Sequence, residues 1–517
     1  MKQVLLDLSP EEYHNADLLA AAVCRALRTS AAAAPRFRVA RRSIDCRRRN
    51  VLYHTTVEVY EPHESIPSPA DIRPPQRDCR QGQPVIVVGA GPAGLFAALR
   101  LIEAGLRPII IERGKAVEER KADIVALSRS RQVDPDSNWC FGEGGAGTYS
   151  DGKLYTRSTK RGDVGAVLRT FVAHGADPDI MLDAHAHIGT DRLGAIIARM
   201  RHTIVACGGE YRFGTRVQDI ALRNGRVCGV VDSRGILHEG IAVVLATGHS
   251  ARDIYHLFAS HGWSLEAKPF AIGVRVEHPQ SLINEIQYHG SGYSPLLPPA
   301  AYSLVTQVGH RGVFSFCMCP GGVIVPAATG ERQQVVNGMS NAHRSSPFAN
   351  SGIAVTVSPA DVPDGASGDP LALLRFQQQV EQRAFEAAAH PLDAPAQRLV
   401  DFMRRRPSSS LNRSNYMGPT SAAPLHEVLP PFVTEALIQG FKDFDRKMKG
   451  FVTAEASLLA VESRTSSPVR IPRHPATLQH PQLPGLYPCG EGAGYAGGIV
   501  SSALDGIRCA EALIATL

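Results

Sequence analysis

Long hydrophobic runs are missing from this sequence. No apolar stretch in the 517 residues is long enough to cross a bilayer, and the N-terminus MKQVLLDLSPEEYHN lacks the apolar core of a secretion signal. The ten cysteines show no paired framework of regular spacing, which in a chain of this length indicates reduced thiols. We therefore expect a soluble, cytoplasmic protein with no membrane partner, and we predict no metal site.

A strong charge of either sign is also missing. The formal net charge of +6 is small for this length and does not by itself predict nucleic-acid binding. Two local clusters, 41–49 and 404–406, are more basic, and a solvated surface is the preferred interpretation of each. With 44% hydrophobic and 20% charged residues, the composition is that of a globular protein rather than a disordered or fibrous one. The length predicts two or three domains.

The first 80 residues have the pattern of a separate small unit. Its strand-like and helical runs are KQVLLDL, NADLLAAAVCRAL, RFRVARRSID and NVLYHTTVEVYE. A proline-rich polar stretch follows at 62–84 and is typical of a linker. The sequence therefore predicts a small α+β module over residues 1–80, and it shows no internal repeat.

A complete dinucleotide-binding pattern follows the linker. An apolar strand, Val85 to Val88, leads into a turn whose glycines are Gly89, Gly91 and Gly94; a helix and a second strand follow, and that strand ends at Glu112. In such a turn the first glycine permits the tight bend, the second lets backbone approach a pyrophosphate, and the third lets helix and strand pack closely. The carboxylate after the second strand suits ribose hydroxyls. The pattern therefore predicts a nucleotide site.

The same glycine spacing recurs at Gly142-x-Gly144-x-x-Gly147, within CFGEGGAGTYSDGKL. No apolar strand precedes this repeat and no apolar helix follows it, so it is not a second Rossmann turn. Two interpretations stay open for this loop of small residues: close backbone approach to a flat ligand, or an ordinary glycine-rich surface loop.

Two later segments complete the pattern. Residues 210–253 alternate as a three-stranded meander, with a hairpin signal at Asn224-Gly225, and return to an apolar strand that ends at Thr247-Gly248. Near the C-terminus a short strand runs into Gly490-Glu491, and a glycine-rich turn leads to a final helix from about Ile499.

Together these motifs resemble flavoproteins of the glutathione-reductase-type FAD fold. More narrowly, FGEGGAGTYSDGKL, SFCMCPGG, NGMSN, ESRTSSPVRI and GEGAGYAGGIVSSALDGI, with the RRSID strand of the N-terminal module, resemble a predicted FAD-dependent dehydrogenase family. The resemblance covers nearly the whole chain and implies an α/β fold. It implies a discontinuous FAD-binding Rossmann domain (81–260 and 455–517), an inserted α+β substrate domain (261–454) and the small N-terminal α+β module.

The resemblance also implies which residues hold FAD. The segment from Gly142 to Lys153 would wrap the flavin end of FAD. Glu112 would hold the adenosine ribose, and Glu491 would bind a ribityl hydroxyl. The final helix would point its N-terminus at the flavin. The complete predicted set is Gly89, Gly91, Pro92, Ala93, Gly94, Glu112, Arg113, Gly145, Ala146, Gly147, Ser150, Asp151, Lys153, Val217, Thr247, Gly248, Gly490, Glu491, Gly498 and Ile499.

Four residues are candidates for the chemistry, and each also has a structural interpretation. Cys317 and Cys319 offer thiols to the flavin or are small buried residues of a strand, and CxC closes a disulfide badly. Lys153 lies near the flavin or pairs with a carboxylate. Arg464 clamps an acidic substrate or braces the domain joint. Hydride transfer needs positioning more than acid–base groups, so no single residue is preferred as the catalyst.

We predict an FAD-dependent oxidoreductase, of dehydrogenase or oxidase type, that transfers hydride between FAD and a small organic substrate. The sequence shows one dinucleotide fingerprint, so NAD(P)H, if used, binds only transiently. Three alternatives remain: an NAD(P)H-dependent monooxygenase or reductase, an FAD-dependent RNA-modifying enzyme, and a non-enzymatic flavin-binding protein. The substrate and the oligomeric state stay open.

Overall fold

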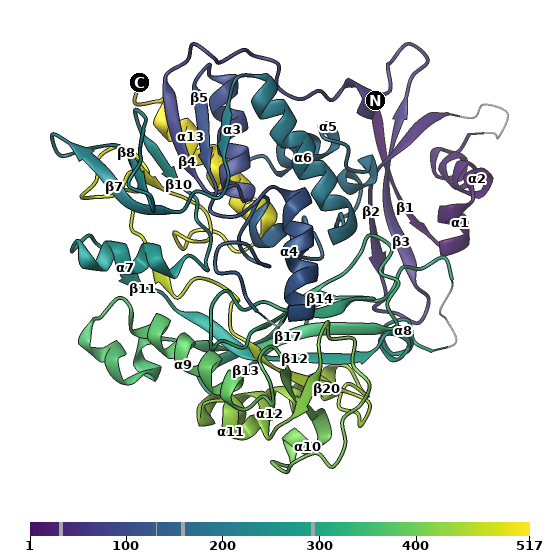
Figure 1. The fold of residues 1–517 in the computed structure, drawn as a ribbon. Coiled ribbons are helices and arrows are strands. Elements are labelled where there is room, and N and C mark those ends of the chain that lie inside the picture. Colours follow the sequence, from purple (N-terminus) through teal and green to yellow (C-terminus); the bar gives the residue numbers. More distant parts are fainter. Residues whose placement is uncertain (30–34, 131, 157–160, 291–294) are drawn as a thin grey trace.

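The computed structural model describes residues 1–29, 35–130, 132–156, 161–290 and 295–517. Its first layer is a five-stranded parallel sheet in the order β22-β10-β4-β5-β6 (Figure 1). The strands are β4 (Pro84–Val88), β5 (Arg107–Ile111), β6 (Glu210–Arg212), β10 (Val243–Leu245) and β22 (Leu486–Pro488). In chain order this is 3-2-1-4-5 read from β6, the order of nucleotide-binding doubly wound sheets, which places ligands at the carboxyl ends of the strands.

The parallel sheet is apolar on both faces because both are covered. Val85 and Val87 of β4 pack in one core with the helices α3 and α13, whereas Ile86 and Val88 pack in another core with the meander. The helices associated with this layer are α3 (Pro92–Glu103), α4 (Val117–Ser130), α5 (Val164–Ala173), α6 (Thr190–Ala206), α7 (Arg252–Ser260) and α13 (Ile499–Ile514).

The meander is the antiparallel sheet of β7 (Val217–Arg223), β8 (Arg226–Asp232) and β9 (Leu237–Glu239). Its first hairpin turns at Asn224 and Gly225, which have φ of 52° and 74°. Positive φ at both central residues is the signature of the turn type that Asn-Gly favours. The predicted three-stranded meander and its hairpin are therefore confirmed.

The second layer is a seven-stranded sheet in the order β13-β14-β17-β12-β20-β18-β19, below the parallel sheet in Figure 1. Its strands are β12 (Phe270–Pro279), β13 (Val305–Val308), β14 (Arg311–Cys319), β17 (Phe348–Val357), β18 (Ala394–Arg398), β19 (Thr420–Ala422) and β20 (Ser457–Glu462). Its helices are α8 (Gln280–Gln287), α9 (Ala372–Glu386), α10 (Leu399–Met403), α11 (Leu425–Val428) and α12 (Pro431–Lys447). Two short ribbons, β11 (Glu266–Ala267) with β21 (Val469–Arg470) and β15 (Val323–Pro326) with β16 (Val336–Met339), complete the strands.

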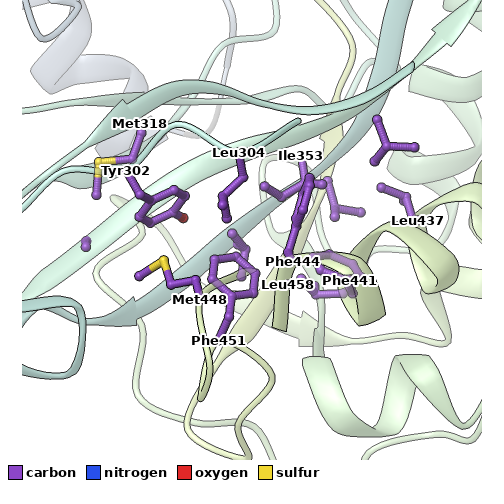
Figure 2. Close-up of a cluster of buried hydrophobic side chains, with 14 of the residues drawn as sticks. Tyr302, Leu304, Met318, Ile353, Leu437, Phe441, Phe444, Met448, Phe451 and Leu458 are labelled. Atoms are coloured by element: carbon purple, nitrogen blue, oxygen red, sulfur yellow. The ribbon is translucent and has the colours of Figure 1, made fainter. Parts of the chain in front are cut away.

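The largest core lies between this sheet and α12. Figure 2 shows Phe441 and Phe444 of α12 with Phe451 beside Ile353 and Leu458 of the strands. These five side chains are fully buried. Burying an aromatic or aliphatic side chain contributes roughly 1.5–3 kcal/mol, so this cluster holds the second layer together.

The N-terminal module is an antiparallel sheet, β1-β3-β2, with two helices. Its elements are β1 (Lys2–Leu8), α1 (Pro10–His14), α2 (Ala16–Leu27), β2 (Arg36–Asp45) and β3 (Leu52–Tyr60), and the sequence predicts all of them except α1. Leu8, Val23 and Val57 belong to the same core as the seven-stranded sheet. Arg42 forms ion pairs with Asp179 and Asp183, so the module is packed onto the body of the protein.

Some boundaries differ from the sequence patterns. Helix α3 begins at Pro92, inside the predicted glycine turn, because proline is well placed at the first position of a helix. Strand β20 pairs with β12 and β18, so the seven-stranded sheet continues beyond residue 454, where we placed the end of the substrate domain. Within the described residues, no helix combines the length and apolar character that crossing a bilayer requires.

Candidate cofactor site

One cleft runs from the carboxyl end of β4 to the edge of the seven-stranded sheet, with a volume of about 1500 Å³ including its open mouth. It is lined by every predicted cofactor residue except Gly94 and by all four predicted chemistry residues, Lys153, Cys317, Cys319 and Arg464. Residues far apart in the sequence thus meet at one place.

The first glycine turn has the backbone that the sequence predicts. Gly89 has φ of 102°, and a Cβ there would lie 2.3 Å from the carbonyl oxygen of Ala246 on the neighbouring strand. At Gly94 a Cβ would lie 1.9 Å from the carbonyl oxygen of Gly89. Gly94 is therefore a packing contact between helix and turn rather than part of the cleft wall. Gly91 occupies the N-cap position of α3, but glycine has no side chain that could accept a hydrogen bond there. The first N–H groups of the helix are therefore available to an anion.

Glu112 joins the two glycine-rich segments. Its carboxylate accepts hydrogen bonds from the backbone N–H of Ala90 (2.8 Å), Gly114 (2.9 Å) and Gly142 (3.0 Å). The side chain is 5% exposed and lines the cleft. One carboxylate therefore fixes the first turn and the start of the second segment relative to each other.

The second glycine segment packs directly on the first turn. The N–H of Gly144 donates to the carbonyl of Ala90 at 2.8 Å, and the segment continues as a single 3₁₀ turn, Gly145–Tyr149. Gly142, Gly144 and Gly145 have φ of 111°, 79° and 60°, which glycine adopts without strain. The repeat of the glycine spacing is thus a second wall of the same cleft, and its close approach to a flat ligand stays a prediction.

Arg120 of α4 holds this second wall, and no sequence pattern singled it out. Its guanidinium is fully buried and donates to the carbonyls of Asn138 (2.8 and 3.0 Å), Glu143 (2.8 Å) and Gly145 (2.8 Å). It also lies over the ring of Tyr149, 4.8 Å from the centroid. A loop of glycines has few side chains of its own to order it, so a buried arginine supplies the hydrogen-bond donors instead.

The N-terminus of α13 also faces the cleft. Gly498 caps this helix without a side-chain acceptor, and Gly497, Gly498 and Ile499 line the wall. A Cβ on Gly506 would lie 2.1 Å from the carbonyl of Ala93, which shows how closely α13 packs on α3. Two uncapped helix N-termini therefore converge on one cleft, and both favour negative charge in the ligand.

Asp151 and Lys153 brace the two layers. The Asp151 carboxylate is 3% exposed and accepts from Ser340 and from Arg344 (3.0 Å). Lys153 donates to the carbonyl of Met318 and lies 3.7 Å from Asp151, with its side chain 36% exposed. The structure thus gives Lys153 a carboxylate partner and a place in the cleft wall at the same time.

Cys317 faces the cleft from a bulge in β14. The pairing of β14 with β17 shifts register between Phe316 and Cys319, and Cys317 has φ of 45°. Cys317 is exposed through the cleft, whereas Cys319 is buried. The surrounding protein desolvates the Cys317 thiolate and raises the pKa of this thiol to about 11, although Lys153 acts in the opposite direction. The thiol is therefore protonated at neutral pH.

Arg464 braces the domain joint. It donates to Ser250 (3.0 Å), Thr329 (2.8 Å) and Gln333 (2.8 Å), and its Nε lies 3.3 Å from the Glu381 carboxylate. These partners engage all three guanidinium nitrogens. The contacts support the bracing interpretation of Arg464 rather than a clamp on a substrate.

The sequence analysis did not assign several residues of the cleft wall. Among them are Cys140, Phe141, Thr215, Ser250, Phe316, Asn337, Gly338, Gly497 and Ser502. Asn337 and Gly338 lie in the NGMSN motif that carried part of the resemblance. A Cβ on Gly338 would lie 2.3 Å from the Arg275 guanidinium, so packing explains that glycine.

A protein of Clostridium beijerinckii, described only as an uncharacterized protein, is 44% identical over 434 residues, which cover 83% of this chain and 80% of that protein. The chain belongs to the family of this clostridial protein. Three family descriptions match its parts: a domain of unknown function at residues 1–60, an FAD binding domain at 83–129, and "FAD-dependent protein, C-terminal domain-like" at 269–465. FAD is therefore the cofactor of this family member.

Solved structures are similar at low identity. CtdE in complex with FAD is 11% identical, with 84% of this chain and 85% of that chain covered and a TM-score of 0.32. The halogenase PltM is 11% identical, with 84% and 70% covered and a TM-score of 0.40. A geranylgeranyl bacteriochlorophyll reductase-like protein of Thermoplasma acidophilum is 13% identical, with 83% and 77% covered and a TM-score of 0.34.

The cleft fits FAD. The N–H groups at the start of α3 suit the pyrophosphate, and Glu112 directly follows β5, where a ribose would lie. The uncapped start of α13 supplies a second positive pole for the other end of an elongated ligand. The role of each individual residue toward FAD stays a prediction.

Glu491 is expected to make FAD binding depend on pH. Burial raises the pKa of its carboxyl to about 7, against the opposing effect of Lys268. FAD brings two negative phosphates, so it favours the protonated carboxyl and takes up a proton on binding. We therefore expect affinity for FAD to fall several-fold as pH rises through about 7, and Glu491→Gln to flatten this dependence. Fluorescence titration of the apoprotein measures it, and a wild-type affinity that is flat or rises with pH would contradict the expectation.

Cys317→Gly is expected to stabilise the protein. A left-handed conformation costs a non-glycine residue roughly 1–2 kcal/mol, and glycine removes this cost. Glycine also makes the unfolded chain more flexible, which lowers stability by about 0.5–1 kcal/mol, so we expect the free energy of unfolding to rise by about 0.5 kcal/mol. Cys319→Gly is the matched control, because Cys319 is buried and its φ is not positive, and it should destabilise. Urea unfolding measures the stability of both variants, and equal losses of stability would show that the backbone at Cys317 is not strained.

Proposed function

We propose that this protein is an FAD-dependent oxidoreductase, of dehydrogenase or oxidase type, that transfers hydride between FAD and a small organic substrate. One observation carries the proposal: the cleft that fits FAD extends past the nucleotide-binding layer to the bulge of β14, where Phe316, Cys317 and Asn337 form a wall. FAD supplies the hydride chemistry when bound. A wall beyond the cofactor is where a substrate would be positioned.

The residues of this chain would then act through position and charge. The start of α13 would favour the negative charge of reduced cofactor. The protonated Cys317 and the fully engaged Arg464 offer no ready base, which supports a reaction driven by positioning rather than by proton abstraction. Strand order 3-2-1-4-5 with a meander crossover supports the glutathione-reductase-type fold that we propose for the nucleotide-binding layer.

NAD(P)H would bind only transiently. The parallel sheet described here is the single sheet of its kind among the described residues, so no second Rossmann unit is available to hold a pyridine nucleotide. All ten cysteines are described and none forms a disulfide, which supports the cytoplasmic location that we propose.

Ion pairs within the two basic clusters, 41–49 and 404–406, support a solvated surface there rather than an RNA-binding site. Arg42 pairs with Asp183, Arg47 with Asp45, Arg405 with Glu435, and Arg406 with Asp401. Each of these carboxylates offsets a positive charge that RNA phosphates would otherwise meet. We therefore keep a small molecule as the proposed partner.

Anaerobic mixing of the FAD-loaded protein with single metabolites tests the proposal through loss of the flavin absorbance. We expect a small organic substrate to bleach the flavin, and NADH and NADPH to do so slowly or not at all. Rapid bleaching by NADPH would favour the monooxygenase or reductase alternative. Bound FAD that no metabolite and no pyridine nucleotide reduces would contradict the proposal and favour a non-enzymatic flavin protein.

A further inference from the structure

Two clusters of charge each place one cation in the cleft wall, and each has two cations for one carboxylate. In the first, Arg252 lies 2.8 Å from both oxygens of Glu381, and Arg464 lies 3.3 Å from the same carboxylate. Glu381 is fully buried. Burial alone would raise its pKa, but the two arginines lower it to about 2, so this carboxylate is ionised.

The second cluster has the same balance. Arg344 lies 3.0 Å and Lys153 lies 3.7 Å from the buried Asp151 carboxylate. Each cluster therefore carries an excess of one positive charge. Both reach the cleft wall through a cation, since Arg464 and Lys153 line it. Both also join segments of the seven-stranded layer to the nucleotide-binding layer.

Other ionisable groups nearby do not cancel this excess. Arg275 pairs with Glu462 at 2.9 Å directly behind Cys317, which adds no negative charge. His249, in the wall beside Arg464, has its pKa lowered to about 3 by burial and by Arg464 and Arg252. Burial lowers the pKa of His187 as well, and Arg344 adds to the effect. The His249 ring is therefore neutral at physiological pH.

Each cluster also holds a buried donor without an acceptor. Within the described residues, Arg252 Nη1 and Arg344 Nε are both shielded from solvent and have no hydrogen-bond partner. Positive charge in excess of its counterions is costly in a buried site unless an anion compensates it. Arg252 and Arg344 do not line the cleft, so an anion that offsets the excess charge from within the cleft would meet the cations of its wall.

We propose that the substrate of this cleft is a small organic acid whose carboxylate binds at Lys153 in the cleft wall. This inference rests on the proposed function, because it names the class of molecule that the cleft beyond FAD accepts. The phosphates of FAD do not supply this negative group, because the site suited to them is the start of α3, beside the first glycine turn. Lys153 is the direct contact, because its ammonium keeps donors beyond the one that it gives to Met318.

Titration of the FAD-loaded protein with matched acids and amides tests this inference. The pairs are acetate with acetamide, hexanoate with hexanamide, and benzoate with benzamide, which keep shape and change charge. The perturbation of the flavin absorbance reports occupancy without turnover. We expect the acid to bind about tenfold or more tightly than its amide in at least one pair, with an advantage that shrinks at high salt. Equal affinity in every pair, or no binding by any acid, overturns the inference.

Two lysine variants localise the effect. Lys153→Met should weaken acid binding by about tenfold and leave amide binding unchanged. Lys442→Met removes a lysine from the exposed surface of α12 and should change neither. An acid affinity that survives Lys153→Met overturns the assignment to Lys153. If that variant loses FAD, the acid-to-amide ratio of the wild-type protein still decides.

The outcome is separable from the test of the proposed function. Acid binding without any substrate that bleaches the flavin would leave the inference standing and remove the oxidoreductase. Bleaching by a neutral substrate, together with equal affinity for acids and amides, would keep the oxidoreductase and overturn the inference.

Discussion

Arg120→Met is expected to lower the free energy of unfolding by about 2–4 kcal/mol and to abolish retention of FAD through purification. Methionine keeps the length of the side chain but removes every donor. The carbonyls of Asn138 and Gly145, which accept from the buried guanidinium at 2.8 Å, then lose that donor inside the protein. The glycine-rich wall would lose its order, and FAD would lose one side of its site. Urea unfolding and the absorbance of bound flavin measure the two effects.

Lys121→Met is the matched control, because Lys121 is the next residue of α4 and is exposed. We expect this variant to unfold within about 0.5 kcal/mol of the wild-type protein and to keep its FAD. If Arg120→Met also kept its FAD and its stability, the glycine-rich wall would not depend on the buried arginine.

Asp505→Asn is expected to cost about 3–5 kcal/mol of stability. The Asp505 carboxylate accepts two hydrogen bonds from Arg473, at 2.6 and 2.9 Å, and one from the N–H of Gly490 at 2.8 Å. Both charged side chains are 4% exposed or less. Removing one charge of such a pair leaves the other buried without compensation. It also frees the segment that positions Gly490 and Glu491 in the cleft wall.

Glu511→Gln controls for charge on the same helix, α13. Glu511 pairs with Arg100 at 3.3 Å, but its side chain is 51% exposed, so removing its charge should cost less than about 1 kcal/mol. Thermal or urea unfolding compares the two variants. Similar losses from Asp505→Asn and Glu511→Gln would show that burial does not set the strength of the Arg473–Asp505 pair.

Local patterns predicted the parts of the site that short segments encode. The turn from Gly89 to Gly94, the strand before it and Glu112 after it form one contiguous unit, and its chemistry is written in adjacent residues. The same holds for the hairpin at Asn224 and for the start of α13 at Ile499. In these places propensity, turn chemistry and hydrophobic period agree.

Long-range pairing explains what the sequence did not reveal. Arg120 is an ordinary helical arginine until the fold places the segment from Asn138 to Gly145 against it. Arg464 meets Glu381 across 83 residues, and the bulge at Cys317 arises from the register of β14 on β17. Helices α4, α5 and α6 were not predicted, and α4 in particular has a weak apolar face. Such features depend on which segments meet, and one sequence does not contain that information locally.

Two segments of the same glycine spacing line a single cleft, so we expect them to build one FAD site. Calorimetric titration of the apoprotein with FAD tests it most directly, because it counts sites without assuming where they lie. We predict saturation at one FAD per chain, since Gly144 packs on Ala90 and Glu112 holds both segments in a single wall. Saturation at two per chain would contradict the account, because the second glycine segment would then bind a nucleotide of its own.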